Sequence, residues 1–257
     1  MFVGDVVASP GRKGFAEAMP ELRERFRPDL VIVNGENSAG GVGITPKTAR
    51  ELLRSGADVI TLGNHAYRRS EVLDYLDGDD PVIRPSNFRR SNPGRGFVLV
   101  GVGDRTVAVV NLIGRIGLDA ARSPFDEADG LLEELTGRAD AIVVDFHAEV
   151  TSEKVALGWY LDGRVAAVLG THTHVPTADG RILPGGTAFI SDVGMTGSRN
   201  GVLGVDREVI IERMRTGLPA RFTDATGDVW VMGAAIEVAD DGLATSIEPF
   251  QIPAPGA

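Results

Sequence analysis

The chain is organised around the stretch Val165-Ala166-Ala167-Val168-Leu169-Gly170-Thr171-His172-Thr173-His174. Its first five residues are apolar without polar alternation, which is typical of a strand covered on both faces. Side chains two residues apart in an extended segment point to the same side, so we expect His172 and His174 to converge on one point. Two imidazoles at one point favour a metal ion, although a histidine pair at a strand end can also be hydrogen-bonded surface.

Four further apolar runs end in side chains that can bind a metal. They span residues 1–3, 30–33, 59–62 and 141–144. Strands that alternate with helices predict an α/β fold, in which ligand sites form outside the carboxyl ends of the strands. All four histidines of the chain therefore fall at one edge of the predicted sheet, and the pattern predicts a metal site there. The residues at the five strand ends are Asp5; Glu36 and Asn37; Asn64 and His65; His147; and His172 and His174.

Apolar spacing, capping residues and turns predict the remaining elements. Thr45-Pro46 reads as an N-cap followed by proline at the first helical position, and Ser123-Pro124 opens another helix. We expect a single domain over residues 1–257 that ends in a loose tail at 253–257. Helices are predicted near 14–26, 46–53, 70–76, 124–135, 151–160 and 206–214, and further strands at 97–102, 106–111, 187–192, 229–238 and 245–252.

Composition narrows the class of protein. Thirty-six acidic residues against 26 Lys and Arg give a net charge of −10, which opposes an extended nucleic-acid surface. The chain has no cysteine, so a metal must bind histidine, carboxylate and amide groups, a set that suits iron or manganese better than structural zinc. Neither a membrane span nor a signal peptide is evident, so we expect a cytoplasmic protein without a membrane partner. Assembly into a homo-oligomer is left open.

Other motifs give weaker signals. Residues 41–48 nearly spell a phosphate-binding P-loop, but Pro46 stands where that motif needs its second glycine and lacks the amide donor. Asp5 can also cap the turn or helix that follows it. No Gly-x-Ser-x-Gly and no strand-linked Gly-x-Gly-x-x-Gly occurs, which argues against serine-hydrolase chemistry and a dinucleotide site.

The number of candidate ligands exceeds what one metal needs. Seven oxygen and nitrogen ligands with a bridging group fill two adjacent sites, and two metals about 3.5–4 Å apart can share a hydroxide that attacks phosphorus in line. The pattern therefore favours phosphoester hydrolysis by a dinuclear metal centre.

These motifs resemble the calcineurin-like metallophosphoesterases, and more narrowly the YmdB-like branch, over nearly the whole chain. The resemblance implies a four-layer α-β-β-α sandwich with two mixed sheets, and hydrolysis of small phosphodiesters such as 2′,3′- or 3′,5′-cyclic nucleotides. Val7, Glu36 and the extra Thr171 depart from the broad superfamily and fit the narrower branch. The motifs are Gly4-Asp5-Val6-Val7, Asn34-Gly35-Glu36-Asn37, Gly63-Asn64-His65, Asp145-Phe146-His147-Ala148-Glu149 with Thr151-Ser152-Glu153-Lys154, and Gly170 through Asp179.

The resemblance also implies a role for each site residue. One metal is expected on Asp5, Glu36, Asn37 and His174, and the other on Glu36, Asn64, His147 and His172, with Glu36 shared. His65 is expected to be catalytic, donating a proton to the leaving oxygen or holding the phosphate; alternatively it orients Asn64.

Other functions remain open at this point. A phosphomonoesterase or a nuclease can be built on the same site, and a non-catalytic protein that senses a nucleotide or metal is a different class. Several polar residues near the motifs have no assigned role, namely Glu149, Asp179, Asp192, Arg84, Arg115 and Arg199.

Overall fold

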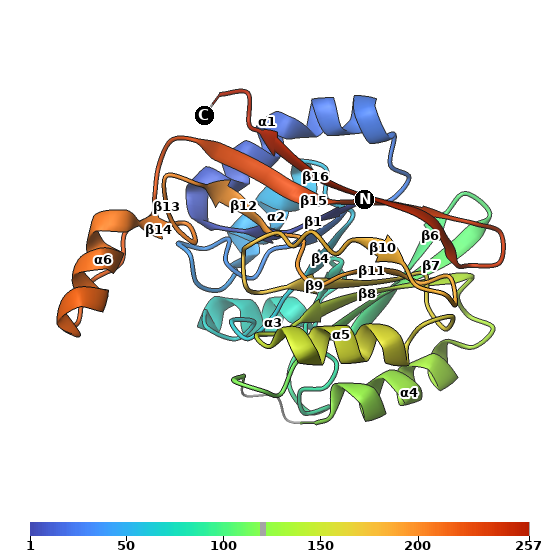
Figure 1. Ribbon diagram of the computed structural model, residues 1–257. Helices are drawn as coiled ribbons and strands as arrows, with labels where there is room; N and C mark the ends of the chain where they lie inside the picture. The colour runs from blue at the N-terminus through green and yellow to red at the C-terminus, as the bar shows by residue number, and fades with distance from the viewer. Residues whose placement is uncertain (119–121, 257) are drawn as a thin grey trace.

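Two β-sheets face each other at the centre of the computed structural model, which describes residues 1–118 and 122–256 (Figure 1). The first sheet is mixed, because β1 is parallel to β3 and antiparallel to β15. Its strands run in the order β2 (Asp5–Val6), β12 (Met195–Ser198), β15 (Val229–Val238), β1 (Phe2–Val3), β3 (Ile32–Asn34), β4 (Val59–Thr61) and β5 (Val82–Ile83), and β16 (Ala244–Pro253) pairs with β15.

The second sheet is mixed as well. Its middle strands are parallel, and an antiparallel strand closes each edge. The order is β10 (Arg181–Ile182), β11 (Ala188–Ile190), β9 (Ala167–Thr171), β8 (Ala141–His147), β7 (Arg105–Ile113) and β6 (Phe97–Val102).

Helices cover the outer faces of both sheets (Figure 1). One apolar cluster packs α1 and α2 on the first sheet, a second lies between the sheets, and a third packs α4 and α5 on the second sheet. This arrangement confirms the predicted four-layer α-β-β-α sandwich with two mixed sheets. The helices are α1 (Ala8–Phe26), α2 (Pro46–Arg54), the 3-10 turn η1 (Ser70–Val72), α3 (Leu73–Leu76), α4 (Pro124–Leu135), α5 (Thr151–Tyr160) and α6 (Arg207–Thr216).

The predicted helix starts are confirmed where a polar side chain caps the first turn. Thr45 accepts a hydrogen bond from the backbone of Thr48, and Ser123 accepts one from Asp126. Asp206 likewise caps α6 by accepting from the backbones of Glu208 and Val209. Among the described residues, no helix is long and apolar enough to cross a membrane.

Three local predictions were wrong. The first helix begins at Ala8 rather than near residue 14. Val7, at the N-cap position, makes no side-chain capping hydrogen bond, so no capping residue marks this helix start in the sequence. The tail expected at 253–257 is partly ordered, since Pro253 ends β16 and Ala254 is buried with its N–H donating to Val229; Ala257 lies outside the described residues. The third concerns the histidine pair and is described below.

Residues 201–228 form an arm that leaves the sandwich. It contains the two-stranded ribbon β13 (Gly201–Val202) and β14 (Val205–Asp206), followed by α6. Figure 1 shows α6, in orange, projecting beyond the layers on one side of the molecule.

Candidate metal centre

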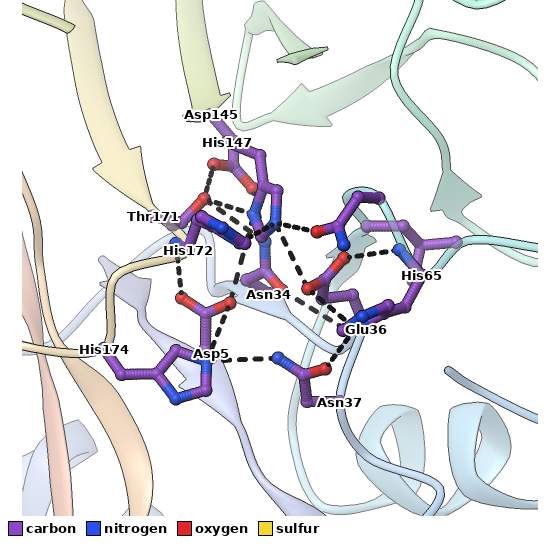
Figure 2. Close-up of polar contacts among 12 residues, drawn as sticks. Asp5, Asn34, Glu36, Asn37, His65, Asp145, His147, Thr171, His172 and His174 are labelled. Carbon is purple, nitrogen blue, oxygen red and sulfur yellow. Dashed lines mark hydrogen bonds and ion pairs between the residues drawn. The ribbon is translucent and has the colours of Figure 1, made fainter. Parts of the chain in front are cut away.

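The predicted site residues gather where the two sheets meet at the carboxyl ends of their parallel strands (Figure 2). Asp5 begins β2, and His147 ends β8, so both are held by strand pairing. Glu36 and Asn37 follow β3, and His65 follows β4. The alternation of strands and helices thus brings together side chains from five distant parts of the chain, as the sequence predicted.

The two histidines of the central stretch are not in a strand. β9 ends at Thr171, and His172 and His174 have φ angles of 94° and 64°. Their imidazoles therefore do not converge by strand alternation, which is a correction to the sequence interpretation. Instead, the turn sends them to different partners: His172 reaches His147, and His174 reaches Asp5.

One group of possible metal-ligand atoms surrounds the Nε2 atom of His147. This atom lies 3.1 Å from Glu36 Oε1, 3.0 Å from Asn64 Oδ1 and 3.0 Å from His172 Nδ1. Ligand atoms of Glu36, His147 and His172 all lie within 4.8 Å of one another, close enough to hold one cation. These four residues are those that the resemblance assigned to one metal.

A second group lies beside the first and is looser. His174 Nε2 is 3.7 Å from Asp5 Oδ1 and 3.1 Å from Asn37 Nδ2. His174 Nδ1 donates to the backbone carbonyl of Leu203, 3.3 Å away, which turns Nε2 toward the Asn37 amide and the Asp5 carboxylate. Asp5 and His174 therefore offer a second set of ligand atoms, with Glu36 between the two groups. Asn37 lies beside them and presents its amide nitrogen to His174 and its oxygen to His65.

Two buried carboxylate oxygens show that the site fits a cation. Asp5 Oδ1 and Glu36 Oε1 accept no well-aligned hydrogen bond within the described part of the chain, although imidazole nitrogens of His174 and His147 lie 3.7 Å and 3.1 Å away, and both side chains are fully buried. Buried polar atoms are nearly always paired, because an unpaired one loses its hydration without compensation. A cation between these oxygens and the imidazole nitrogens would satisfy both groups at once.

Gly63 leaves the space in which these ligands meet. A Cβ at this position would lie 2.3 Å from Glu36 Oε2 and 2.3 Å from His147 Nε2. A methyl group there would displace both side chains. The glycine before Asn64 is thus required by the site itself.

The pKa values of the charged residues reflect their mutual burial. Burial alone would raise the pKa of Glu36, but the charge and hydrogen bond of His147, together with His65, hold it well below its usual value. Burial would lower the pKa of His147, and the surrounding carboxylates, Glu36 above all, outweigh it and raise it to about 9. In the protein without a cation, His147 therefore carries the positive charge that balances the carboxylates.

The pKa values of Asp5 and His172 shift in the opposite directions to those of Glu36 and His147. Burial raises the pKa of Asp5, and the charges of His174 and His147 offset this only in part. Burial and the adjacent positive charge of His147 lower the pKa of His172 to about 3. His172 is therefore neutral at physiological pH, which is the form that binds a metal.

His65 lies at the open side of the site. Its side chain is 24% exposed, its Nδ1 is 2.8 Å from Asn37 Oδ1 and 3.3 Å from Glu36 Oε1, and its backbone N–H donates to Glu36. Its side-chain partners among the described residues are Asn37 and Glu36.

A buried hydrogen-bond chain behind His147 was not found from the sequence. His147 Nδ1 lies 2.9 Å from Thr171 Oγ1, and Thr171 donates to Asp145. Asn34 donates to the other oxygen of Asp145, whose pKa burial raises to about 7. The chain orients the His147 ring so that Nε2 faces the site. The available signal in the sequence was that the polar residues Asn34 and Asp145 each directly follow an apolar run.

A buried ion pair supports the turn between the two histidines. Lys154 Nζ lies 2.7 Å from Asp192 Oδ2, and both side chains are almost fully buried. The same carboxylate accepts from the backbone and hydroxyl of Thr173, which lies between His172 and His174. Asp192 thus positions the turn.

Three of the residues without an assigned role also have clear contacts. Glu149 Oε2 lies 2.9 Å from His172 Nε2, on the ring edge opposite His147. Asp179 accepts from Thr177 and Ser191 and stabilises a loop. Arg84 donates to backbone carbonyls of its own loop.

Comparison with known proteins agrees with this geometry. A family model described as YmdB-like protein matches residues 1–250. The 2′,3′-cyclic-nucleotide 2′-phosphodiesterase of Bacillus subtilis (strain 168) is 50% identical over 240 residues, which cover 93% of this chain and 91% of that protein.

Two solved structures share the fold over nearly their whole length. A hypothetical protein from Thermus thermophilus has a TM-score of 0.93 and 43% identity, over 99% of this chain and 98% of that one. A structure described as a novel phosphatase from Mycoplasma pneumoniae has a TM-score of 0.91 and 33% identity, over 98% and 92%.

Proposed function

This chain belongs to the YmdB-like protein family, and from that membership and its site we propose that it is a metal-dependent phosphodiesterase of small phosphodiesters. The substrates proposed are 2′,3′- or 3′,5′-cyclic nucleotides. The name of the B. subtilis relative, a 2′,3′-cyclic-nucleotide 2′-phosphodiesterase, supports the first of these. The observation that carries the proposal is the pair of fully buried carboxylate oxygens of Asp5 and Glu36, which accept no well-aligned hydrogen bond from the described residues and face imidazole nitrogens of His147 and His174.

The ligands proposed for two cations follow the two groups of donor atoms. Glu36 is shared, and iron or manganese suits a set made only of imidazole, carboxylate and amide. When bound, the cations supply positive charge for the phosphoryl oxygens and lower the pKa of the attacking water. The proposed ligands are Asp5, Glu36, Asn37 and His174 for one cation, and Glu36, Asn64, His147 and His172 for the other.

The protein's own residues hold and orient these groups. Thr171 fixes the ring of His147, Leu203 fixes the ring of His174, and Asp192 holds the turn between His172 and His174. The side chain of His65 is about a quarter exposed and lies beside Glu36 and Asn37. We assign it the role of donating a proton to the leaving oxygen or a hydrogen bond to the phosphate.

Substrate and metal tests separate this function from its alternatives. Bis(p-nitrophenyl) phosphate and 2′,3′-cyclic AMP should be turned over faster than p-nitrophenyl phosphate, and chelation should abolish both activities until Mn²⁺ or Fe²⁺ is restored. A dominant monoesterase rate would instead support a phosphatase, the word used for the M. pneumoniae structure. Binding of a cyclic nucleotide by the metal-loaded protein without cleavage would indicate a sensor.

A further inference from the structure

Two acidic residues near the start of α5, Glu149 and Glu153, have no part in the proposed function. Glu149 lies just before the helix with its side chain 55% exposed, whereas Glu153 lies in the first turn and is buried. Glu149 Oε2 lies 2.9 Å from Nε2 of His172, one of the proposed metal ligands. A carboxylate that accepts a hydrogen bond from the outer nitrogen of a metal-binding imidazole fixes the orientation of the ring.

The two neighbours of the His172 ring determine which of its nitrogens carries the proton. Nδ1 lies 3.0 Å from His147 Nε2, within the group of possible ligand atoms, and it must keep its lone pair to bind a cation. Nε2 faces the carboxylate of Glu149, which only accepts hydrogen bonds. The neutral ring therefore suits both neighbours only with its proton on Nε2.

The loop that follows β7 is tied to the metal centre at two points. Gly114 donates its backbone N–H to the carbonyl oxygen of His147, 3.0 Å away. Glu153 accepts hydrogen bonds from the backbone N–H groups of Arg115, at 2.8 Å, and Ile116, at 3.3 Å. The buried carboxylate of Glu153 thus anchors this loop to α5.

The anchored loop packs against the side chain of Glu149. A Cβ at Gly117 would lie 3.5 Å from Glu149 Cγ, an ordinary contact distance. Exposed ion pairs are weak in general, because two free side chains must be immobilised to form them. With the loop against its aliphatic part, Glu149 loses less freedom when it meets His172.

We propose that Glu149 is a positioning residue of the metal centre. Its carboxylate holds the His172 ring with the proton on Nε2 and the lone pair of Nδ1 toward the proposed cation, and the anchored loop keeps Glu149 in place. This role rests on the proposed function, because His172 is a ligand only in a protein that binds a cation. Glu149 itself stays outside the group of ligand atoms formed by Glu36, His147 and His172.

The proton on His172 can be observed without any metal. Long-range ¹H–¹⁵N correlation spectra of the metal-free protein distinguish protonated from unprotonated ring nitrogens, and only four histidines need to be assigned. The unchanged protein should carry the His172 proton on Nε2, and Glu149→Ala should speed its exchange with water by about tenfold or more, the effect of losing a hydrogen bond to a charged group. Glu149→Gln should keep most of the protection, because its amide oxygen still accepts.

A matched control separates this role from the loss of a surface charge. Glu134 has a side chain 53% exposed and pairs with Arg138 on α4, so Glu134→Ala should leave the exchange of the His172 proton unchanged. A proton on Nδ1 instead of Nε2 in the unchanged protein would overturn the proposal. Equal exchange rates in the unchanged protein and in Glu149→Ala would overturn it too.

Metal titration tests the consequence for the site. Glu149→Ala should weaken Mn²⁺ binding in isothermal titration by about 10- to 100-fold, the range for loss of the partner of a ligating histidine. Glu149→Gln should weaken it much less, and equal losses in the two variants would show that charge alone acts and would overturn the positioning role. Glu153→Gln, which has one acceptor oxygen for two loop N–H groups, should shift exchange and affinity in the same direction as Glu149→Ala but by less.

The two measurements also separate this role from the proposed function. If Glu149→Ala binds Mn²⁺ as tightly as the unchanged protein, the positioning role is wrong and the proposed function stands. If the unchanged protein binds no Mn²⁺ or Fe²⁺, the proposed function is wrong, and the exchange measurement still decides whether Glu149 holds the His172 ring.

Discussion

His172 Nδ1 lies 3.0 Å from His147 Nε2 at the centre of the site. Two ring nitrogens at this distance cannot both carry a proton, and the surrounding charges raise the pKa of His147 to about 9 while that of His172 falls to about 3. One proton therefore occupies the point where the ligand atoms converge. A cation and this proton compete for the same place.

This competition predicts how metal affinity depends on pH. His147 must lose its proton before Nε2 can bind a cation, so affinity should rise by about tenfold per pH unit and level off near pH 9. Isothermal titration of the metal-free protein with Mn²⁺, between pH 6.5 and pH 9 in buffers of different ionisation enthalpy, measures both affinity and proton release. An affinity that is independent of pH in this range would contradict the assignment of His147.

The same shift predicts the stability of the metal-free protein. Because the pKa of His147 is raised by folding, its contribution is fully present below its ordinary value of 6.5 and is lost as the pH rises through about 9. Glutamine at position 147 has no proton to lose there. Chemical denaturation of the metal-free protein should therefore show this loss above pH 6.5, and His147→Gln should remove it.

His65→Ala should separate catalysis from metal binding. The ring contacts Asn37 and Glu36 but lies at the edge of the site, so metal content should stay unchanged while kcat falls by about 100- to 10,000-fold, the range for loss of a general acid. Elemental analysis and steady-state kinetics on one preparation measure both. If the metals are lost together with the ring, His65 is a ligand and its proposed role is wrong.

Gly63→Ala should close the metal centre. The added methyl would lie 2.3 Å from atoms of Glu36 and His147, so metal content and activity should fall together. Gly101→Ala is the matched control, because a Cβ at that exposed strand position meets no atom within 4 Å. A Gly63→Ala protein that keeps its full metal content would show that the ligands meet elsewhere.

The α/β class and the grouping of site residues could be predicted from regular periodicity, whereas the four-layer sandwich was implied by the resemblance to a known family. Buried parallel strands read as apolar runs, and their carboxyl ends must meet at one edge. Thr45 and Ser123 marked the starts of two helices, because a capping hydrogen bond joins residues only three positions apart. The two closing strands expected at 229–238 and 245–252 are present as β15 (Val229–Val238) and β16 (Ala244–Pro253), which pair antiparallel.

The turn that carries His172 and His174 could not be predicted, because it depends on contacts distant in sequence. Its left-handed backbone is held by Asp192, which lies after β11, and by Leu203 on the arm. Local alternation gives no information about such partners. The projection of α6 from the sandwich could not be predicted either, because its capping residue and apolar spacing are those of an ordinary surface helix.

The buried pair of Lys154 and Asp192, which the sequence left without a role, predicts a graded set of effects. Asp192→Ala leaves the Lys154 ammonium buried without its carboxylate, so the free energy of unfolding should fall by about 3–5 kcal/mol. Lys154→Met should cost less, because the backbone and hydroxyl of Thr173 and the backbone of Gly194 still donate to Asp192. Since the carboxylate holds the turn between two proposed ligands, metal affinity should fall by about 10- to 100-fold in Asp192→Ala.

Denaturation and metal titration of Asp192→Ala, Lys154→Met and the double variant form a double-mutant cycle that measures both effects. A double variant that regains stability but not metal affinity would show that Asp192 acts on the metal centre through Thr173, whereas recovery of both would reduce its role to balancing the charge of Lys154.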